Sequence, residues 1–532
     1  MPETNDLEEL TIARFHEGVR EGSLSSRELT QWYLDRIAAH NVDGAAINAV
    51  VTVNPSALAE AEARDAAFSA SGQLTGPLHG VPVLVKDQAE TAGIPTAFGS
   101  AAFADYVPEA DARVVELLRA AGAVILAKTA MCDFAAGWFS SSSRTGHTLN
   151  AYDATRDSGG SSAGTGAGVS VNFGLVGVGE DTGGSIRIPA SFNNIYGLRV
   201  TTGLISRTGF SPLVHFQDTP GPMARTVEDL ATLLEVMVGY DPSDEYTAVA
   251  ATEQSAVGYA ASLTDVPPLS RWRVGILETA FGEGEEAQEV NTVVRRAIAD
   301  ITAAGSAIVE GLEIDGLPQW ISDTSVYVRQ SRSDLNRFLG SRQGPVASFD
   351  ELTASGRFEA LNDLIPEIAA GPADTEGDTE VTRLRLNQEH FRRMLRTLFA
   401  EADADFVVYP TVQVPAPTHE GLRAGQYTAL SFPTNTVIWL CQLKPNPPGQ
   451  SSEDPLALGD AVSPGRLCSL LGGLWGRVGL GAGGFPDGSG GVGVEDADAD
   501  ADDDVEPAGG EPDREDVDED DGEVGEGVVA GG

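Results

Sequence analysis

The sequence predicts an α/β fold, in which helices and short buried strands alternate along most of the chain. Several segments carry apolar residues every three or four positions, as amphipathic helices do, and several shorter apolar runs have the length of buried strands. The hydrophobic share of 42% over 532 residues is enough for a sizeable core. No apolar run reaches the length of about 18 residues that a membrane-spanning helix needs.

The segments near the start of the chain that are predicted to be helices are residues 25–40, 55–70 and 109–121. The first begins with Ser25 and Glu28 at the spacing of a capping box. Its apolar residues Leu29, Tyr33 and Ile37 recur every four positions, which places them on one helix face. We therefore expect this helix to bury that face against the rest of the domain.

The remaining predicted elements follow in chain order: a strand at 123–126, a helix followed by a strand at 173–178, a strand at 273–277, a helix at 287–303, a strand at 307–314, a helix at 384–400 and a strand at 406–410. Short apolar runs bounded by turn residues are typical of buried strands. Their alternation with helices favours the α/β class.

The last part of the chain has a different character. Residues 441–532 contain 21 of the 61 glycines and an acidic block at 495–521, without a periodic apolar segment. This composition is typical of disordered chain. We expect one domain over 1–440, with a helical part at about 7–70 and a core at about 71–440, followed by a largely disordered tail. A solvated acidic tail is the simpler interpretation, and an interaction module is the alternative.

Acidic residues strongly outnumber basic ones. The chain has 79 acidic and 34 basic residues, a net charge of −45, and residues 1–440 alone have 57 and 30, a net charge of −27. This balance disfavours nucleic acid and anionic membranes as partners. Because salt relieves self-repulsion on this scale, we predict a high-salt cytoplasm, as in halophiles.

The cysteines and the start of the chain indicate the compartment. Cys132, Cys441 and Cys468 have neither the spacing of a zinc site nor that of a disulfide framework. The first residues, MPETNDLEEL, are acidic, whereas a secretory signal has a basic segment followed by an apolar one. We therefore expect a cytoplasmic protein without a metal or another cofactor.

Two Gly-Ser turns flank a small-residue segment and an apolar run between residues 157 and 187 (DSGGSSAGTGAGVSVNFGLVGVGEDTGGSIR). Glycine lets backbone N–H groups crowd around a ligand atom, because no Cβ blocks the approach. The residues that could supply N–H donors to an oxyanion are Thr182, Gly183, Gly184 and Ser185. A single Gly/Ser stretch is usually a flexible linker, but the paired arrangement is far more specific.

On these motifs the sequence resembles the amidase signature family, the Ser-cisSer-Lys amidases. In that family GGSSGG is followed, 24 residues from its first serine to the nucleophile, by D-x-GGS-x-R; Ser161 and Ser185 have that spacing within GGSSAG and DTGGSIR. The family's G-x-P-x-x-x-K-D segment is matched by GVPVLVKD, which contains Lys86. The resemblance covers about residues 7–440. It implies the amidase signature fold, a large mixed and twisted β-sheet with helices on both faces.

Lys86 indicates a chemical role by its context alone. It follows the apolar run Val83–Val85, so it is expected to be partly desolvated, which lowers the pKa of the amine and makes a neutral base available. The chain has three lysines against 31 arginines, and a lysine at this position suggests a group that must lose its proton. A snorkelling or structural lysine is the alternative. By its family position, Lys128 is interpreted as structural.

The resemblance implies a serine relay. Neutral Lys86 accepts a proton from Ser161, Ser161 accepts one from Ser185, and Ser185 Oγ attacks a carboxamide carbon to form an acyl-enzyme. The turn that contains Thr182, Gly183, Gly184 and Ser185 is called the nucleophile turn. Its backbone N–H groups stabilise the oxyanion, and Asp181 and Arg187 brace it. No histidine takes part. The partner is a small-molecule amide, and a homodimer stays open.

The chain departs from the family pattern near the relay and at its C-terminal end. The family often has proline at Ser158, glycine at Ala163, and threonine or serine at Glu180; we expect these changes to affect loop stiffness or substrate access only. After FPTN at 432–435 the family continues with a Gly-Leu-Pro strand region that returns to the central sheet, and no such sequence follows here. We hypothesise a frameshifted or otherwise replaced terminus from about residue 436.

Three functions remain open. A stand-alone amidase is the first. The second is the glutaminase component of a tRNA-dependent amidotransferase, its A subunit, which frees ammonia from glutamine; that subfamily usually has Gln-Pro where this chain has Ile188 and Pro189, which favours the stand-alone enzyme. The third is an inactive family member with a damaged core.

Overall fold

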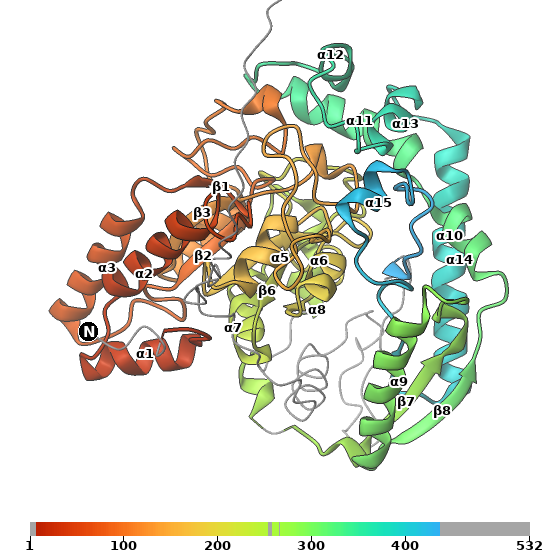
Figure 1. The fold of residues 1–532 in the computed structure, drawn as a ribbon, viewed down its shortest axis with the longest axis horizontal. Coiled ribbons are helices and arrows are strands. Elements are labelled where there is room, and N and C mark those ends of the chain that lie inside the picture. Colours follow the sequence, from red (N-terminus) through yellow and green to blue (C-terminus); the bar gives the residue numbers. More distant parts are fainter. Residues whose placement is uncertain (1–6, 254–257, 265, 437–532) are drawn as a thin grey trace, which may run out of the picture. The chain divides into compact units, whose positions relative to one another are not determined.

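The computed structural model describes three stretches of the chain: residues 7–253, 258–264 and 266–436. The described residues all belong to one compact unit (Figure 1). The acidic tail and the terminus hypothesised beyond residue 436 lie outside the described residues. None of the helices described is both long and apolar enough to cross a membrane.

The larger sheet has six strands in the order β1-β3-β2-β4-β6-β5. Their bounds are β1 (Val50–Val53), β2 (Pro82–Lys86), β3 (Val124–Thr129), β4 (Val176–Glu180), β5 (Tyr196–Gly197) and β6 (Pro220–Ala224). Strands β3, β2 and β4 run parallel in the middle, whereas β1, β6 and β5 are antiparallel to their neighbours. The predicted mixed sheet is confirmed.

Strand β2 is buried on both faces of this sheet. A Cβ added to Gly168 of helix α5 (Ala163–Ser170) would lie 2.9 Å from the side chain of Leu84, so Leu84 faces α5. Because side chains alternate along a strand, Val83 and Val85 point to the opposite face, where they are also fully buried. A continuous apolar run covered on both faces is typical of a parallel strand at the centre of an α/β sheet.

A smaller parallel sheet has the order β8-β7-β9. Its elements are β7 (Arg273–Leu277), β8 (Ala307–Leu312), β9 (Phe406–Val408) and the helices α9 (Gln288–Ala303) and α14 (Thr379–Ala402). Ile301 of α9 packs with Val274 and Ile276, and Phe391 of α14 packs with Leu277. The strands of the described part therefore form two sheets, where the resemblance implies one large sheet.

The other helices surround these sheets (Figure 1). They are α1 (Ile12–Glu21), α2 (Ser26–His40), α3 (Ala57–Ser71), α4 (Arg113–Ala120), α6 (Arg187–Phe192), α7 (Val227–Met237), α8 (Ala248–Glu253), α10 (Leu317–Thr324), α11 (Tyr327–Gly340), α12 (Phe349–Ala354), α13 (Leu364–Ala370) and α15 (His419–Arg423). Helices α11, α12 and α13 pack together through Leu335, Phe349 and Ile365.

The predicted elements are present, with some ends shifted. The capping box of α2 is formed as expected, because Ser25 and Glu28 each accept the backbone N–H of the other. Helix α14 begins earlier than predicted, because Asp378 caps it by accepting the N–H groups of the next turn. Strand β9 ends before Pro410, which has no N–H for strand pairing.

Candidate active site

Lys86 ends strand β2 and lies beside the end of β4. The two strands pair in parallel, with Val85 opposite Val178, so their carboxyl ends meet at one edge of the sheet. The Lys86 side chain is fully buried, and its Nζ donates hydrogen bonds to Ser161 Oγ at 2.8 Å and to the Glu180 carbonyl oxygen at 3.1 Å. The structure thus brings the predicted lysine and the predicted middle serine together.

Ser161 lies on a loop whose geometry requires glycine. Gly159 has a φ of +74°, in the left-handed region, and the Gly160 N–H donates to the Trp138 carbonyl oxygen at 2.7 Å. A Cβ on Gly160 would lie 2.3 Å from the Phe139 carbonyl oxygen, so a larger residue does not fit there. The peptide bond between Gly160 and Ser161 is cis, as the resemblance implies.

The second Gly-Ser turn connects β4 to α6 and places Ser185 beside the first turn. The Ser162 N–H donates to the Ser185 carbonyl oxygen at 3.1 Å, and the Ser162 hydroxyl accepts the Glu180 N–H at 3.3 Å. Ser185 is 2% exposed, and Ser161 is fully buried. The two predicted serines therefore lie in adjoining turns that are almost closed to solvent.

Asp181 organises the nucleophile turn. Its Oδ1 accepts the Gly184 N–H at 2.7 Å, and its Oδ2 accepts the Ile186 N–H at 3.0 Å. Arg187 and Arg199 form ion pairs with the carboxylate at 2.9 Å and 3.2 Å. Burial disfavours the charged form of Asp181, but the two guanidinium groups hold the pKa of its carboxyl below the usual range. An ionised carboxylate thus fixes the backbone around the nucleophile.

The hydrogen bond from Gly184 to Asp181 corrects the predicted set of oxyanion donors. The Gly184 N–H points at the carboxylate and is not free to bind an oxyanion. The N–H groups of Thr182, Gly183 and Ser185 have no hydrogen-bond partner in the part of the chain that the structure describes. These are the donors that remain available for an oxyanion.

Glu180 lies in the site and contacts Lys86, a contact that the expected effect on loop stiffness or substrate access does not include. Its Oε2 is 3.5 Å from Lys86 Nζ, and both side chains are fully buried. Burial lowers the pKa of Lys86, and the Glu180 carboxylate opposes that shift. Burial likewise raises the pKa of Glu180, and Lys86 opposes that shift. The protonation of the lysine therefore depends on a carboxyl that the family pattern does not include.

A second buried carboxyl lies next to this pair. The Thr182 hydroxyl donates to Asp218 Oδ1 at 2.6 Å, and it also lies 3.4 Å from a Glu180 carboxyl oxygen. Burial, together with the nearby Glu180, raises the pKa of Asp218 well above its ordinary value. The sequence pattern alone did not indicate Asp218, because only the folded chain brings it to Thr182.

The last described residue, Thr436, also contacts the nucleophile turn. Its hydroxyl donates to the Gly183 carbonyl oxygen at 2.5 Å, and its carbonyl oxygen accepts a hydrogen bond from Arg187 at 2.7 Å. Residue 436 is the point at which a replaced terminus is hypothesised to start. The described chain thus reaches the active-site turn at that point.

Two aromatic side chains line the same turn. A Cβ on Gly183 would lie 1.8 Å from the hydroxyl oxygen of Tyr327, so this tyrosine packs directly against the backbone of the turn. Trp138 packs edge-on against Tyr327, with ring centroids 6.0 Å apart. Only glycine at position 183 allows this approach.

Lys128 lies apart from the serines. Its fully buried ammonium group donates to the Ala89 carbonyl oxygen and to the hydroxyls of Thr91 and Thr96, at 3.0 Å and 3.3 Å for the hydroxyls. Burial lowers the pKa of Lys128 to about 8. The described contacts of Lys86, Ser161 and Ser185 include neither Lys128 nor a histidine.

The chain is similar in sequence and structure to several known proteins. A family model described as Amidase matches residues 28–446, a range that contains Lys86 and both serines. The glutamyl-tRNA(Gln) amidotransferase A subunit of Ralstonia nicotianae is 38% identical over 333 residues, which are 60% of this chain and 65% of that protein. The chain thus spans just under two thirds of the length of that relative.

Other similar proteins cover more of their own length. A protein of the same name from Chromohalobacter salexigens is 34% identical over 420 residues, 77% of this chain and 83% of that protein. Among solved structures, the native peptide amidase of Stenotrophomonas maltophilia has a TM-score of 0.71 and 28% identity, and the match covers 88% of this chain and 97% of the peptide amidase.

Proposed function

Because the chain belongs to the amidase family, we propose that it hydrolyses a carboxamide C–N bond to a carboxylic acid and ammonia or an amine. The observation that carries the proposal is the hydrogen bond of 2.8 Å between Lys86 Nζ and Ser161 Oγ, in a buried position beside the Ser185 turn. A small-molecule amide is the proposed substrate, and residues 1–440 are the proposed catalytic domain.

The first half of the reaction acylates Ser185. Neutral Lys86 accepts the hydroxyl proton of Ser161 while Ser161 accepts that of Ser185, and Ser185 Oγ forms a bond to the carbonyl carbon. The N–H groups of Thr182, Gly183 and Ser185 donate to the resulting oxyanion. The proton returns along the relay to the nitrogen, the C–N bond breaks, and ammonia or the amine leaves an ester on Ser185.

The second half releases the acid. Water attacks the ester carbon and gives a proton to the relay, and Ser185 Oγ leaves with a proton from Ser161. Lys86 returns to its neutral form, because the protons taken up and released in the two halves are equal. The buried site favours this neutral form, and the Glu180 carboxylate opposes it.

The A subunit of a tRNA-dependent amidotransferase is the second candidate function. The names of the two relatives described above favour it. The apolar Ile188 after the nucleophile turn, where that subfamily usually has glutamine, favours the stand-alone amidase. Glutamine hydrolysis that starts only when partner subunits are added would support the second candidate over the first.

A serine-directed fluorophosphonate probe tests the proposed nucleophile. In high salt we expect the wild type to be labelled, Ser185→Ala to be unlabelled, and Lys86→Ala to react roughly 10²–10⁴-fold more slowly, because the base is lost. Ser158→Ala is the matched control: its hydroxyl is buried without a hydrogen-bond partner in the described part of the chain, so labelling should persist. A wild type that stays unlabelled at every salt concentration would favour the inactive interpretation.

Untreated wild-type protein from the same preparation should then be assayed with a panel of aliphatic, aromatic and anilide amides, peptide C-terminal amides and glutamine. Ammonia or amine release from members of this panel, lost in Ser185→Ala, would support the stand-alone amidase. Labelling without turnover of the panel would contradict it.

A further inference from the structure

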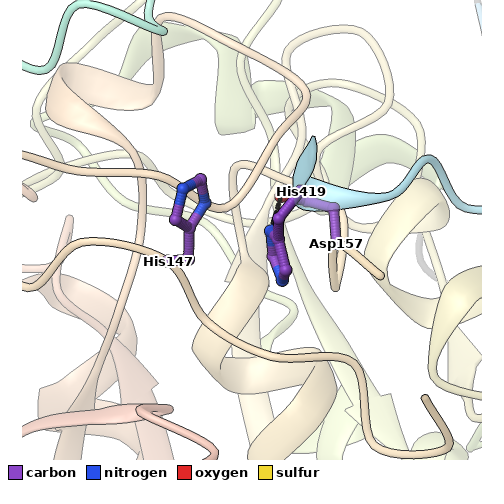
Figure 2. Close-up of side chains that lie close together, drawn as sticks. All are labelled: His147, Asp157 and His419. Carbon is purple, nitrogen blue, oxygen red and sulfur yellow. Dashed lines mark ion pairs between the residues drawn. The ribbon is translucent and has the colours of Figure 1, made fainter. Parts of the chain in front are cut away.

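Three side chains from separate segments gather beside the loop that precedes Ser161: His147, Asp157 and His419 (Figure 2). One nitrogen or carboxylate oxygen of each lies within 4.8 Å of the others. The rings of the two histidines have centroids 4.4 Å apart, and His419 Nδ1 lies 3.8 Å from Asp157 Oδ2. This cluster contains no residue of the proposed relay.

The backbone holds the three segments together. The Asp157 N–H donates to the Pro417 carbonyl oxygen at 2.9 Å, and the His419 N–H donates to the Thr155 carbonyl oxygen at 3.0 Å. Asp157 also forms a β-bridge with Leu149, near His147. Backbone hydrogen bonds therefore help to position the three side chains, in addition to the contacts among them.

The histidines have buried ring nitrogens without partners. His419 is 7% exposed, and neither of its ring nitrogens has a hydrogen-bond partner among the described residues. The same is true of Nδ1 of His147. Buried polar atoms are nearly always satisfied, so these nitrogens point to a missing ligand.

Asp157 is oriented as a carboxylate ligand usually is. Its oxygens accept the Ser140 N–H at 3.1 Å, the Ser140 hydroxyl at 2.7 Å and the Gly159 N–H at 2.7 Å. A carboxylate has about four acceptor positions, so three donors leave room for a further bond. Among the described residues, its ion-pair partner is His419 and no arginine or lysine. The described surroundings of this buried carboxyl thus leave room for a bound cation.

We propose that His147, Asp157 and His419 bind one Zn²⁺ ion, with water completing the coordination. Two imidazoles and one carboxylate suit a borderline-soft transition ion, whereas Ca²⁺ and Mg²⁺ prefer oxygen ligands throughout. Ligands of a tetrahedral zinc lie roughly 3.3 Å apart, so the side chains must close slightly, and the partly exposed His147 can rotate to do so.

The ion would be structural. Asp157 accepts the N–H of Gly159, in the glycine pair that precedes Ser161, and His419 begins α15. A bound ion would therefore fasten α15 and the segment of His147 to the base of the relay loop. We expected no metal because the cysteines lack the spacing of a zinc site. The proposed ligands are histidines and an aspartate that lie far apart in the sequence, so cysteine spacing could not indicate them.

Zinc binding by the purified full chain tests the proposal. After EDTA treatment and dialysis, ZnCl₂ should restore about one tightly bound Zn²⁺ per chain by elemental analysis and raise Tm. His419→Gln and His147→Gln should each weaken zinc binding at least about tenfold and abolish the rise in Tm. His390→Gln is the matched control, because His390 lies on α14 against Trp320 and should leave binding unchanged.

The acidic tail is the alternative source of bound zinc, and the variants distinguish it. If millimolar Ca²⁺ displaces the zinc and both histidine variants still bind it, carboxylates alone bind the zinc. That result would overturn the proposal. A wild type that binds no Zn²⁺ would overturn it as well. The partly exposed His147 makes His147→Gln the variant that keeps the test valid if His419→Gln does not fold. Co²⁺ in place of Zn²⁺ should give visible absorption bands that are absent from both variants.

Discussion

Lys86 and Glu180 face each other at the ends of two parallel strands, without access to water. Burial favours an uncharged amine, whereas a carboxylate 3.5 Å away favours an ammonium ion. A threonine or serine at position 180, as the resemblance implies for the family, would leave the effect of burial unopposed. In this chain the carboxylate therefore keeps a larger fraction of Lys86 protonated.

Glu180→Gln should move the acidic limb of the pH profile of kcat/KM to lower pH by about one to three units. The sign follows from the charge: the variant loses the carboxylate that raises the pKa of Lys86, so the neutral amine persists at lower pH. Glu180→Asp, which keeps the charge, is the matched control. The other charged groups near the pair are Asp181, Asp218 and Arg199, and neither variant changes them.

An acidic limb that is the same in Glu180→Gln and the wild type would show that Glu180 does not control the base. A loss of activity at every pH in Glu180→Gln, with intact fluorophosphonate labelling, would instead assign the carboxyl a role in turnover and contradict the prediction.

The nucleophile turn between β4 and α6 is the element on which distant parts of the chain converge. Asp181 fixes it from within, Thr436 bonds to it from the end of the described chain, and Tyr327 of α11 covers Gly183. Because each contact is made to backbone atoms, the geometry of the turn depends on its glycines more than on its side chains.

Gly183→Ala should lower kcat/KM roughly 10²-fold, because a methyl group 1.8 Å from the Tyr327 hydroxyl must displace either the turn or α11. Tyr327→Phe in the same chain should restore part of the activity, since the nearest remaining ring atom would lie 3.1 Å away. Gly239→Ala is the control, because nothing lies within 4 Å of the added carbon. Equal activities in the single and double variants would contradict this steric account.

Sequence patterns predict a helix or strand well where the signal lies within the residues of that element. The capping residues of α2 and the apolar run of β2 are local signals, and both elements form as expected. Strand β6 is different: its sequence PGPMA contains two prolines, and it becomes a strand by pairing with β4 and β5. The pairing of β2 with β4, which brings Glu180 to Lys86, likewise depends on a register that sequence spacing does not specify.

The residues of the site were likewise predictable only where the signal is local in the sequence. The relay serines and Lys86 could be predicted because they lie in motifs with fixed spacing. Asp218, Tyr327 and the ring nitrogens of His147 and His419 reach their places only through tertiary contacts, so no spacing in the sequence indicates them.

At the scale of the whole molecule, we predict that charge affects the stability. The chain carries a net charge of −45, and repulsion among surface carboxylates acts over about 10 Å at 0.1 M salt but only about 3 Å at 1 M. Buried carboxyls have a second effect on stability, because they too destabilise the fold when they ionise. Burial raises the pKa of Asp87, Asp133 and Asp229 to about 6 each.

A carboxyl whose folded-state pKa lies above its unfolded value stabilises the fold fully below the unfolded pKa, and this stabilisation is lost as the pH rises through the folded pKa. For Asp87, Asp133 and Asp229 the loss falls between the ordinary aspartate pKa and about 6. Asp181 has the opposite sign, because its pKa is held low and its contribution is lost only in stronger acid.

Tm should therefore rise with KCl concentration at about pH 8. As the pH rises from about 4 to about 6, the three buried aspartates should lower Tm, against the opposite effect of His16 and His419, whose pKa values burial lowers to about 4. Asp229→Asn, which removes one buried carboxyl, should reduce the pH dependence without changing the salt dependence, because salt does not screen a buried group well. Differential scanning calorimetry over a matrix of pH and salt measures all of these effects. A Tm that is independent of salt at about pH 8 would refute the predicted adaptation to high salt, since the surface repulsion would then be too weak to affect folding.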